Sequence, residues 1–271
     1  AYTNAMETTF YKTVSNNSMV LSPLHIDYTT ANIWNRIVGD GGNNEMAQSY
    51  LASNYGPVNE SSFKFDNYYS TSYSAPYYLK NKVYVNPSSV YQQYRVKDMT
   101  LYPSIYKSIS NNTITYTDDY NETYSLDEVQ EIRNKVKEHI YTKGAVTTYI
   151  YMDNQGVLNT VTGNYSSKYY DNTNKSYYYD GKSTDTCPNY SSYGYCPANH
   201  LVTIIGWDDN YITKANNKGA YIILNSWGST FGYNGYFYVS YDDVNIESGL
   251  SQIDSIERKA SEYENMMNWV I

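Results

Sequence analysis

Two blocks in the last third of the chain decide the fold. Residues 199–209 read NHLVTIIGWDD, and residues 219–228 read GAYIILNSWG. Each block holds a run of β-branched and other apolar residues bounded by turn residues, which predicts one β-strand per block. If the two strands pair antiparallel, the end of the second lies beside the start of the first. The pattern then brings Asn225 within hydrogen-bonding reach of the His200 ring.

A histidine held by a carboxamide is the base-and-orienter part of a nucleophilic triad. From the spacing alone, a strand-edge His200 beside a turn Asn225 without any catalytic role is the better-supported interpretation. The other two histidines, His25 and His139, fall in expected helices and are expected to be ordinary helix residues. With no HExxH motif and no two histidines close in sequence, no metal site and no cofactor are predicted.

The order of the motifs favours catalysis. The Asn-His block, the Asn-Ser-Trp-Gly string at 225–228 and the FGYNGYFY string at 231–238 resemble the signatures of papain-like cysteine peptidases. These strings and the tyrosine-rich insertion are most similar to those of the secreted or surface-attached bacterial members of the family. More weakly, LSPLH at 21–25 and GDGG at 39–42 resemble a helix start and a glycine turn of that family, without the turn's cysteine. The resemblance covers residues 1 to about 250.

The resemblance implies an α+β, papain-like fold of two subdomains with a cleft between them. A helical subdomain would span residues 1–95. A β-rich subdomain with an antiparallel, barrel-like sheet would span residues 96–250 and carry His200 and Asn225. Residues 251–271 are expected to begin a C-terminal extension, so a larger parent chain is expected.

Local patterns predict the elements of both subdomains. Ser22 and Pro23 mark a helix start, and Ser125 with Glu128 forms a capping box. The stretch 163–195 is expected to be a long tyrosine-rich loop or insertion. Helices are expected at residues 3–14, 23–34, 44–53 and from 126 onward, and strands at residues 145–152, 200–207, 220–225 and 236–241.

Composition limits the partners of the chain. Its 271 residues carry a net charge of −8, which disfavours nucleic-acid binding. No window approaches 18 apolar residues, so no membrane span is expected. Cys187 and Cys196 are most simply interpreted as a local disulfide formed in an oxidising compartment, the alternative being two free thiols in a mobile loop. A secreted or cell-surface bacterial location is expected.

The family's nucleophilic cysteine is expected to lie outside this chain. In the family it begins a long helix, where a low thiol pKa is favoured, and a glutamate follows about ten residues later. Aligning that glutamate with Glu7 places the cysteine about three positions before Ala1, with the oxyanion-hole glutamine further upstream. Ala1 opens the chain without a visible signal peptide, so we expect a processed or truncated form.

The resemblance also implies residue roles. His200 would pair with the thiolate and protonate the leaving amine, Asn225 would orient the His200 ring, and Trp227 would shield their hydrogen bond from water. The substrate-binding residues implied by the family are Gly41, Gly42, Asn199 and Trp227.

The function implied is a cysteine-type peptidase domain that hydrolyses peptide or protein substrates. Without the nucleophile it is expected to be inactive alone. The alternative is a catalytically dead papain-like domain used for binding or surface structure. Retention of both His200 and Asn225 favours the enzyme, since a dead domain need not keep them.

Overall fold

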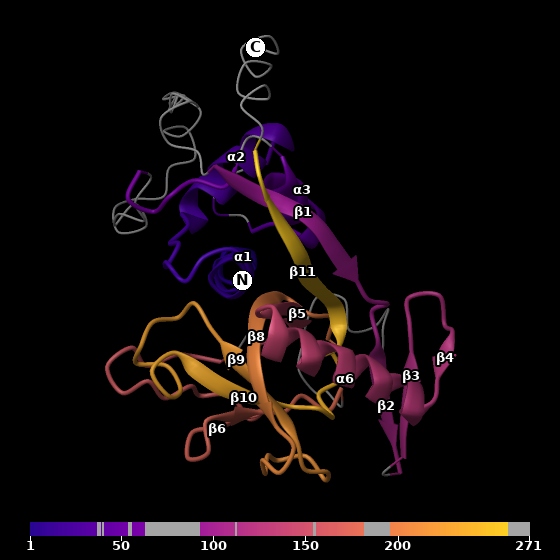
Figure 1. Cartoon of the computed structure of the whole chain (residues 1–271). Helices are drawn as coiled ribbons and strands as arrows, with labels where there is room; N and C mark the ends of the chain where they lie inside the picture. The colour runs from indigo at the N-terminus through magenta and orange to yellow at the C-terminus, as the bar shows by residue number, and fades with distance from the viewer. Residues whose placement is uncertain are drawn as a thin grey trace. The chain divides into compact units, whose positions relative to one another are not determined.

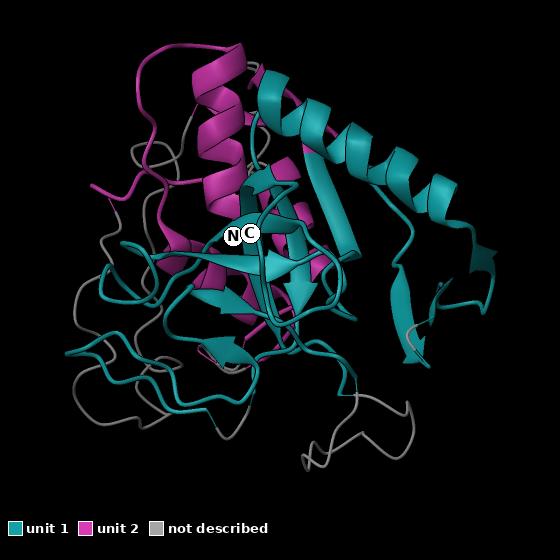
Figure 2. Cartoon of the chain, turned by 90° about the horizontal axis from the view of Figure 1, so that it is seen from below, with its two compact units in different colours: residues 1, 100–252 teal, residues 2–99, 253–271 magenta. Residues whose placement is uncertain are grey.

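The structure, a computed structural model, forms two compact units. It describes residues 1–36, 39, 41–53, 56–62, 93–111, 113–153, 156–181 and 196–259. Unit 1 comprises Ala1 and residues 100–252, and unit 2 comprises residues 2–99 and 253–271 (Figure 2). A few helices and one large, mainly antiparallel sheet confirm the α+β class.

Two helices of unit 2 begin at side-chain caps, one of which, Ser22, the sequence predicts. The Ser22 side chain accepts a hydrogen bond from the His25 backbone at 3.1 Å, and Pro23 opens the helix. The Asn43 side chain caps the next helix through the Met46 backbone at 3.0 Å. The three expected helices are therefore confirmed: α1 (Tyr2–Thr13), α2 (Pro23–Ile33) and α3 (Asn44–Ala52).

Most of the large sheet lies in unit 1. Its neighbouring strands there are, in order, β11 (Ser248–Arg258), β5 (Val146–Ile150), β8 (His200–Asp208), β9 (Ala220–Leu224), β10 (Tyr236–Ser240), β7 (Ser176–Tyr177) and β6 (Tyr170–Asp171). All these pairs are antiparallel except β10 with β7. Strand β11 continues into unit 2, where its neighbour is β1 (Tyr94–Leu101). A small second sheet contains β2 (Tyr106–Ser110), β3 (Thr113–Thr117) and β4 (Thr123–Tyr124).

The sheet is open, so the expected barrel-like form is wrong for the described residues. Closure needs a continuous hydrogen-bonded ladder between the outermost strands. Here the last strands, β7 and β6, are two residues each, which is too short to carry the ladder further. Strands β1 and β11 also cross the expected boundaries after residues 95 and 250, and β11 keeps residues 251–258 in the sheet.

Helix α6 (Leu126–Thr142) covers one face of the sheet at β5 and β8 (Figure 1). Its predicted capping box is present: the Ser125 backbone donates to Glu128 Oε2 at 2.8 Å, and Ser125 Oγ accepts from the Glu128 backbone at 3.3 Å. The buried face includes Val129, Val136 and Ile140, as the periodicity predicts. No helix in the described part of the chain is long and apolar enough to cross a membrane.

The tyrosine-rich stretch 163–195 is described for residues 163–181, which are mainly loop with the two-residue strands β6 and β7; the rest of the expected loop or insertion lies outside the described residues. Its described part supplies buried rings to the core of unit 1, and these rings pack edge-on against each other. Tyrosine suits such a core when its hydroxyl finds a partner. Tyr165 donates to the Asp153 carbonyl at 2.7 Å, and Tyr179 accepts from the Cys196 backbone at 2.7 Å. The buried rings are Tyr165, Tyr169, Tyr170, Tyr177 and Tyr179.

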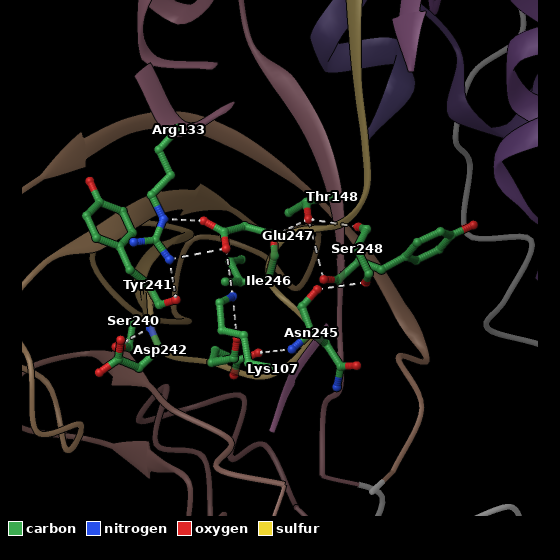
Figure 3. Close-up of polar contacts among 12 residues, drawn as sticks. Lys107, Arg133, Thr148, Ser240, Tyr241, Asp242, Asn245, Ile246, Glu247 and Ser248 are labelled. Atoms are coloured by element: carbon green, nitrogen blue, oxygen red, sulfur yellow. Dashed lines mark hydrogen bonds and ion pairs between the residues drawn. The ribbon is translucent and has the colours of Figure 1, made fainter. Parts of the chain in front are cut away.

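A buried carboxylate, Glu247, joins three parts of unit 1 just before β11. It receives Arg133 Nε of α6 at 2.5 Å and Lys107 Nζ of β2 at 2.9 Å (Figure 3). Arg133 also donates to the Tyr241 carbonyl at 3.2 Å, and Lys107 donates to the Asp243 carbonyl at 2.9 Å. All three charged side chains are thus buried with hydrogen-bond partners. Burial alone would raise the pKa of Glu247, but Lys107 and Arg133 lower it to about 2.

We predict that Glu247→Gln lowers the free energy of unfolding by about 3–5 kcal/mol, because it removes the carboxylate that pairs with two buried cations. Urea unfolding at neutral pH measures this change. The matched control is Glu131→Gln, which breaks an exposed pair with Lys135 and should cost less than about 1 kcal/mol. The low pKa keeps the Glu247 contribution intact above about pH 4.5, and it is lost as the pH falls towards 2. Equal destabilisation by both variants would contradict this account.

Candidate active site

The sheet registers fix the position of His200. His200 opens β8 and pairs with Ile150 of β5. On its other side β8 pairs antiparallel with β9, with Thr203 opposite Leu224. Asn225 therefore follows β9 directly beside the start of β8, and its backbone N–H is held by the Gly235 carbonyl at 3.0 Å. The two residues that the sequence suggested as a pair are brought together.

The expected hydrogen bond joins His200 Nε2 to Asn225 Oδ1 at 2.9 Å. The same oxygen accepts the Ser226 backbone N–H at 2.8 Å, which identifies it as the carbonyl oxygen of the amide. His200 Nε2 is then the donor and carries a proton. In the neutral ring, Nδ1 is left as the nitrogen that can take up or release a proton.

Aromatic rings cover this hydrogen bond. The Trp227 ring lies 5.4 Å from the His200 ring, centroid to centroid, and packs edge-on against Phe231 at 5.1 Å. Tyr165, which belongs to the tyrosine-rich stretch, has its ring centroid 5.5 Å from that of Trp227. Apolar cover of this kind lowers the local dielectric constant and strengthens the hydrogen bond. The shielding role that the resemblance implies for Trp227 stays a prediction.

The surroundings of His200 shift its acidity. Burial lowers the pKa of His200 below its ordinary value, the Asn225 acceptor raises it, and the positive amino group of Ala1 lowers it. The Ala1 carbonyl also accepts a hydrogen bond from Thr203 Oγ1 of β8 at 3.2 Å.

Asn199 fastens the segment before His200 to the end of β5. Its Oδ1 accepts the Met152 N–H at 2.8 Å, and its Nδ2 donates to the Met152 carbonyl at 2.9 Å. Its own backbone N–H donates to the Ile150 carbonyl at 3.1 Å. The Asn199 side chain thus makes the pair of hydrogen bonds that the backbone of a neighbouring strand would make, and this limits rotation of the backbone at His200. Its expected contact with substrate stays a prediction.

A cavity of about 520 Å³ opens beside His200 within unit 1. Sequence reasoning found three of its lining residues and missed the rest. One sequence signal could have found Asp153. This residue comes just after β5, and β5 pairs antiparallel with β8, so Asp153 is expected near His200 for the same reason as Asn225. The lining residues are Met152, Asp153, Gly156, Leu158, Tyr165, Asn199, His200 and Trp227.

The remaining predicted site residues lie elsewhere. Gly41 and Gly42 belong to unit 2, just before α3. Cys196 is buried and disulfide-bonded, while Cys187, the other cysteine of the sequence, lies outside the described residues. Within the described ranges, no three His, Cys, Asp or Glu side chains gather in a way that could hold a metal ion.

Solved structures share the fold of this chain. The chain matches the cysteine protease and lectin-like domains of Cwp84, a surface-layer-associated protein of Clostridium difficile, with a TM-score of 0.63 and 20% identity over 96% of this chain and 47% of that one. A form of Cwp84 after propeptide cleavage matches with a TM-score of 0.61 and 20% identity over 96% and 52%. The chain has the papain-like cysteine protease fold.

Digestive procathepsin L 3 of Tenebrio molitor is a more distant match, with a TM-score of 0.51 and 17% identity over 93% of this chain and 60% of that one. No protein-family model and no curated protein matches the sequence. The chain spans about half the length of the two Cwp84 chains. These likenesses establish the fold and leave activity to be argued from the site.

We predict that Asn225→Ala lowers the pKa of His200 further, because it removes the acceptor that favours the charged ring. Imidazole NMR resonances followed against pH give this value, with Asn210→Ala, an exposed amide, as control. The pKa of His200 is lower in the folded chain than in the unfolded one. The free energy of unfolding should therefore fall as the pH drops from the unfolded-state pKa to the folded-state pKa. A pKa that stays the same or rises in Asn225→Ala would contradict the inferred bond.

Proposed function

We propose that this chain is the main body of a cysteine-type peptidase domain that hydrolyses peptide bonds. The observation that carries the proposal is the bond from His200 Nε2 to Asn225 Oδ1 beneath Trp227, which leaves Nδ1 for proton transfer. A histidine fixed by a carboxamide under aromatic cover is suited to stabilising a thiolate and then acting as general acid. The shared fold adds to this support.

The nucleophilic cysteine would precede Ala1 in the parent protein. The Ala1 carbonyl accepts a hydrogen bond from Thr203 Oγ1, and Thr203 lies on β8, the strand that His200 opens. Residues attached to Ala1 would therefore continue next to His200. A cysteine there would gain a neighbouring imidazolium, which lowers a thiol pKa.

The chemistry would take two steps. The thiolate attacks the peptide carbonyl carbon and forms a C–S bond, while the proton on His200 Nδ1 passes to the leaving nitrogen as the C–N bond breaks. Water then attacks the thioester, with Nδ1 accepting its proton, and the acid product and thiolate are released. Asn225 keeps the ring in place throughout. Oxyanion donors would come from the same upstream segment as the cysteine.

A secreted or cell-surface bacterial location fits two observations. Cys196 is disulfide-bonded, and disulfides persist mainly in oxidising compartments. One structural neighbour is described as a surface-layer-associated protein of Clostridium difficile. The partners proposed are peptide or protein substrates, within a parent chain longer than residues 1–271.

The test begins with the native protein. Peptide mapping by mass spectrometry reads the residues before Ala1, where we expect a cysteine about three positions upstream, the position given by aligning Glu7 with the family's glutamate. The parent protein should then hydrolyse casein in the presence of a thiol reductant.

We predict that His200→Ala lowers kcat/KM by about 10²–10⁴, the range of general acid–base catalysis. Asn225→Ala should cause a smaller loss, since it removes orientation and leaves the acid in place.

Residues 1–271 alone should be inert towards peptides. Thiol-dependent hydrolysis by this chain would overturn the assignment of the nucleophile. Serine, glycine or alanine at the upstream position, with no hydrolysis by the parent, would favour the alternative of a catalytically dead binding or surface-structure domain. Asn210→Ala serves as the control, because its side chain is exposed and lies outside the site.

A further inference from the structure

Thr203 places a hydroxyl group at a fully buried position of β8. Its exposed fraction is 0%, and its neighbours along the strand, Val202 and Ile204, are buried and apolar. Because a buried hydroxyl costs free energy unless it finds a hydrogen-bond partner, packing alone would favour valine here. Thr203 Oγ1 donates to the carbonyl of Ala1 at 3.2 Å. The hydroxyl is therefore used to hold a residue that lies 202 positions earlier in the chain.

The backbone of Thr203 is held from both sides of its strand. It pairs with Thr147 of β5 on one side and with Leu224 of β9 on the other. His200 stands three residues earlier on the same strand. Thr203 is thus part of the three-stranded frame that positions His200, and its hydroxyl ties Ala1 to that frame.

Ala1 directly precedes α1 (Tyr2–Thr13). In the proposed function the nucleophilic cysteine stands about three positions before Ala1. Three positions of an α-helix rise about 4.5 Å, and residues three apart are neighbours on one side of a helix. A backbone carbonyl has two lone pairs, so the Ala1 carbonyl could accept both the Thr203 hydroxyl and a helical N–H. A bond at Ala1 therefore acts within about one helical turn of the cysteine.

We propose that Thr203 is a positioning residue, whose hydroxyl holds the Ala1 carbonyl at β8 and thereby sets the approach of the upstream cysteine to His200. The inference rests on the proposed peptidase function for the presence of that cysteine. Thr203 acts through Ala1, so loss of its hydroxyl should affect the reaction more than the binding of substrate.

The physical reason is the short range of the thiolate–imidazolium interaction. Coulombic attraction falls with distance, and a displacement of about 1 Å between reacting groups can cost about 10²-fold in rate. A cysteine that is held less closely to His200 would gain less from the imidazolium. The pKa of its thiol would then move back towards the ordinary value of a cysteine.

The test compares variants of the native parent protein. Thr203→Val keeps the shape of the side chain and removes the hydroxyl. We expect kcat for casein to fall about threefold to tenfold, the effect of one hydrogen bond, while KM changes less than about twofold. Alkylation of the upstream cysteine by iodoacetamide should require a higher pH than in the wild type. A loss confined to KM, or an unchanged kcat and alkylation profile, would overturn the proposal.

Thr147→Val is the matched control. Thr147 lies opposite Thr203 on β5 and is equally buried, and its hydroxyl donates to the Ser251 carbonyl of β11 at 3.4 Å. This variant makes the same change of atoms in the neighbouring strand, and it should keep the wild-type kcat and alkylation profile. Equal losses in both variants would show that any buried hydroxyl of the sheet has this effect, which contradicts a specific role for the bond to Ala1.

A second pair of variants separates the hydroxyl from the packing. Thr203→Ser and Thr203→Ala both lack the methyl group and differ only in the hydroxyl. The serine variant should keep the wild-type alkylation profile and kcat, and the alanine variant should lose both. This comparison decides the question even if Thr203→Val does not fold, because equal behaviour of the two variants rejects the role of the hydroxyl.

The same measurements distinguish this inference from the proposed function. If the wild-type parent hydrolyses casein and is alkylated at low pH, but the hydroxyl has no effect, the role of Thr203 fails and the peptidase function stands. If the wild-type parent hydrolyses nothing and has no upstream thiol of lowered pKa, the peptidase function fails, and the role of Thr203 fails with it.

Discussion

The site depends on the pairing of β8 with its two neighbours. His200 stands at the first position of β8, and the β9 register delivers Asn225 beside it. A shift of one residue in either pairing would turn the His200 ring to the other face of the sheet. The amide of Asn199, bonded twice to Met152, secures this register at the point where it matters. The 2.9 Å bond to Asn225 is a consequence of backbone geometry fixed by many strand hydrogen bonds.

Glu247 performs a comparable task just before β11, the strand that pairs with β5 on the side away from β8. Its carboxylate links α6, β2 and the start of β11 through two buried cations. Nearby, Thr148 of β5 donates to the backbone carbonyls of Ile246 and Ser248, tying β5 to the same turn (Figure 3). Buried ion pairs contribute little net stability compared with apolar packing, but losing one partner is costly. Such a cluster favours one arrangement of these elements over others.

Local sequence signals predicted much of the fold. Ser22 followed by Pro23, and Ser125 three residues before Glu128, located helix starts because capping depends on residues within one helical turn. The apolar runs of β8, β9 and β10 were equally readable. The open sheet and the burial of Tyr165, Tyr169 and their neighbours were not predicted. Both depend on contacts between segments distant in sequence, and tyrosine is compatible with surface and core alike.

The same distinction applies to the site. His200 and Asn225 were found because each belongs to a distinctive local string, and an antiparallel pairing was enough to join them. Asp153 carries no motif, and only its place after β5, the strand that pairs with β8, could have pointed to it. Arg133 and Glu247 lie 114 positions apart in the sequence, so no local pattern connects the charged residues of this cluster. The resemblance to a family suggested the chemistry of the site, and the structure shows which residues from distant segments lie around it.

The central claim is that His200 activates a cysteine that precedes Ala1. The most direct measurement is the rate of alkylation of that thiol by iodoacetamide in the native parent protein, followed against pH. We predict rapid alkylation well below pH 8.5, the ordinary pKa of a cysteine, and a return to ordinary thiol behaviour in His200→Ala. Alkylation that follows an ordinary thiol in both proteins, or the absence of any upstream cysteine, would contradict the account.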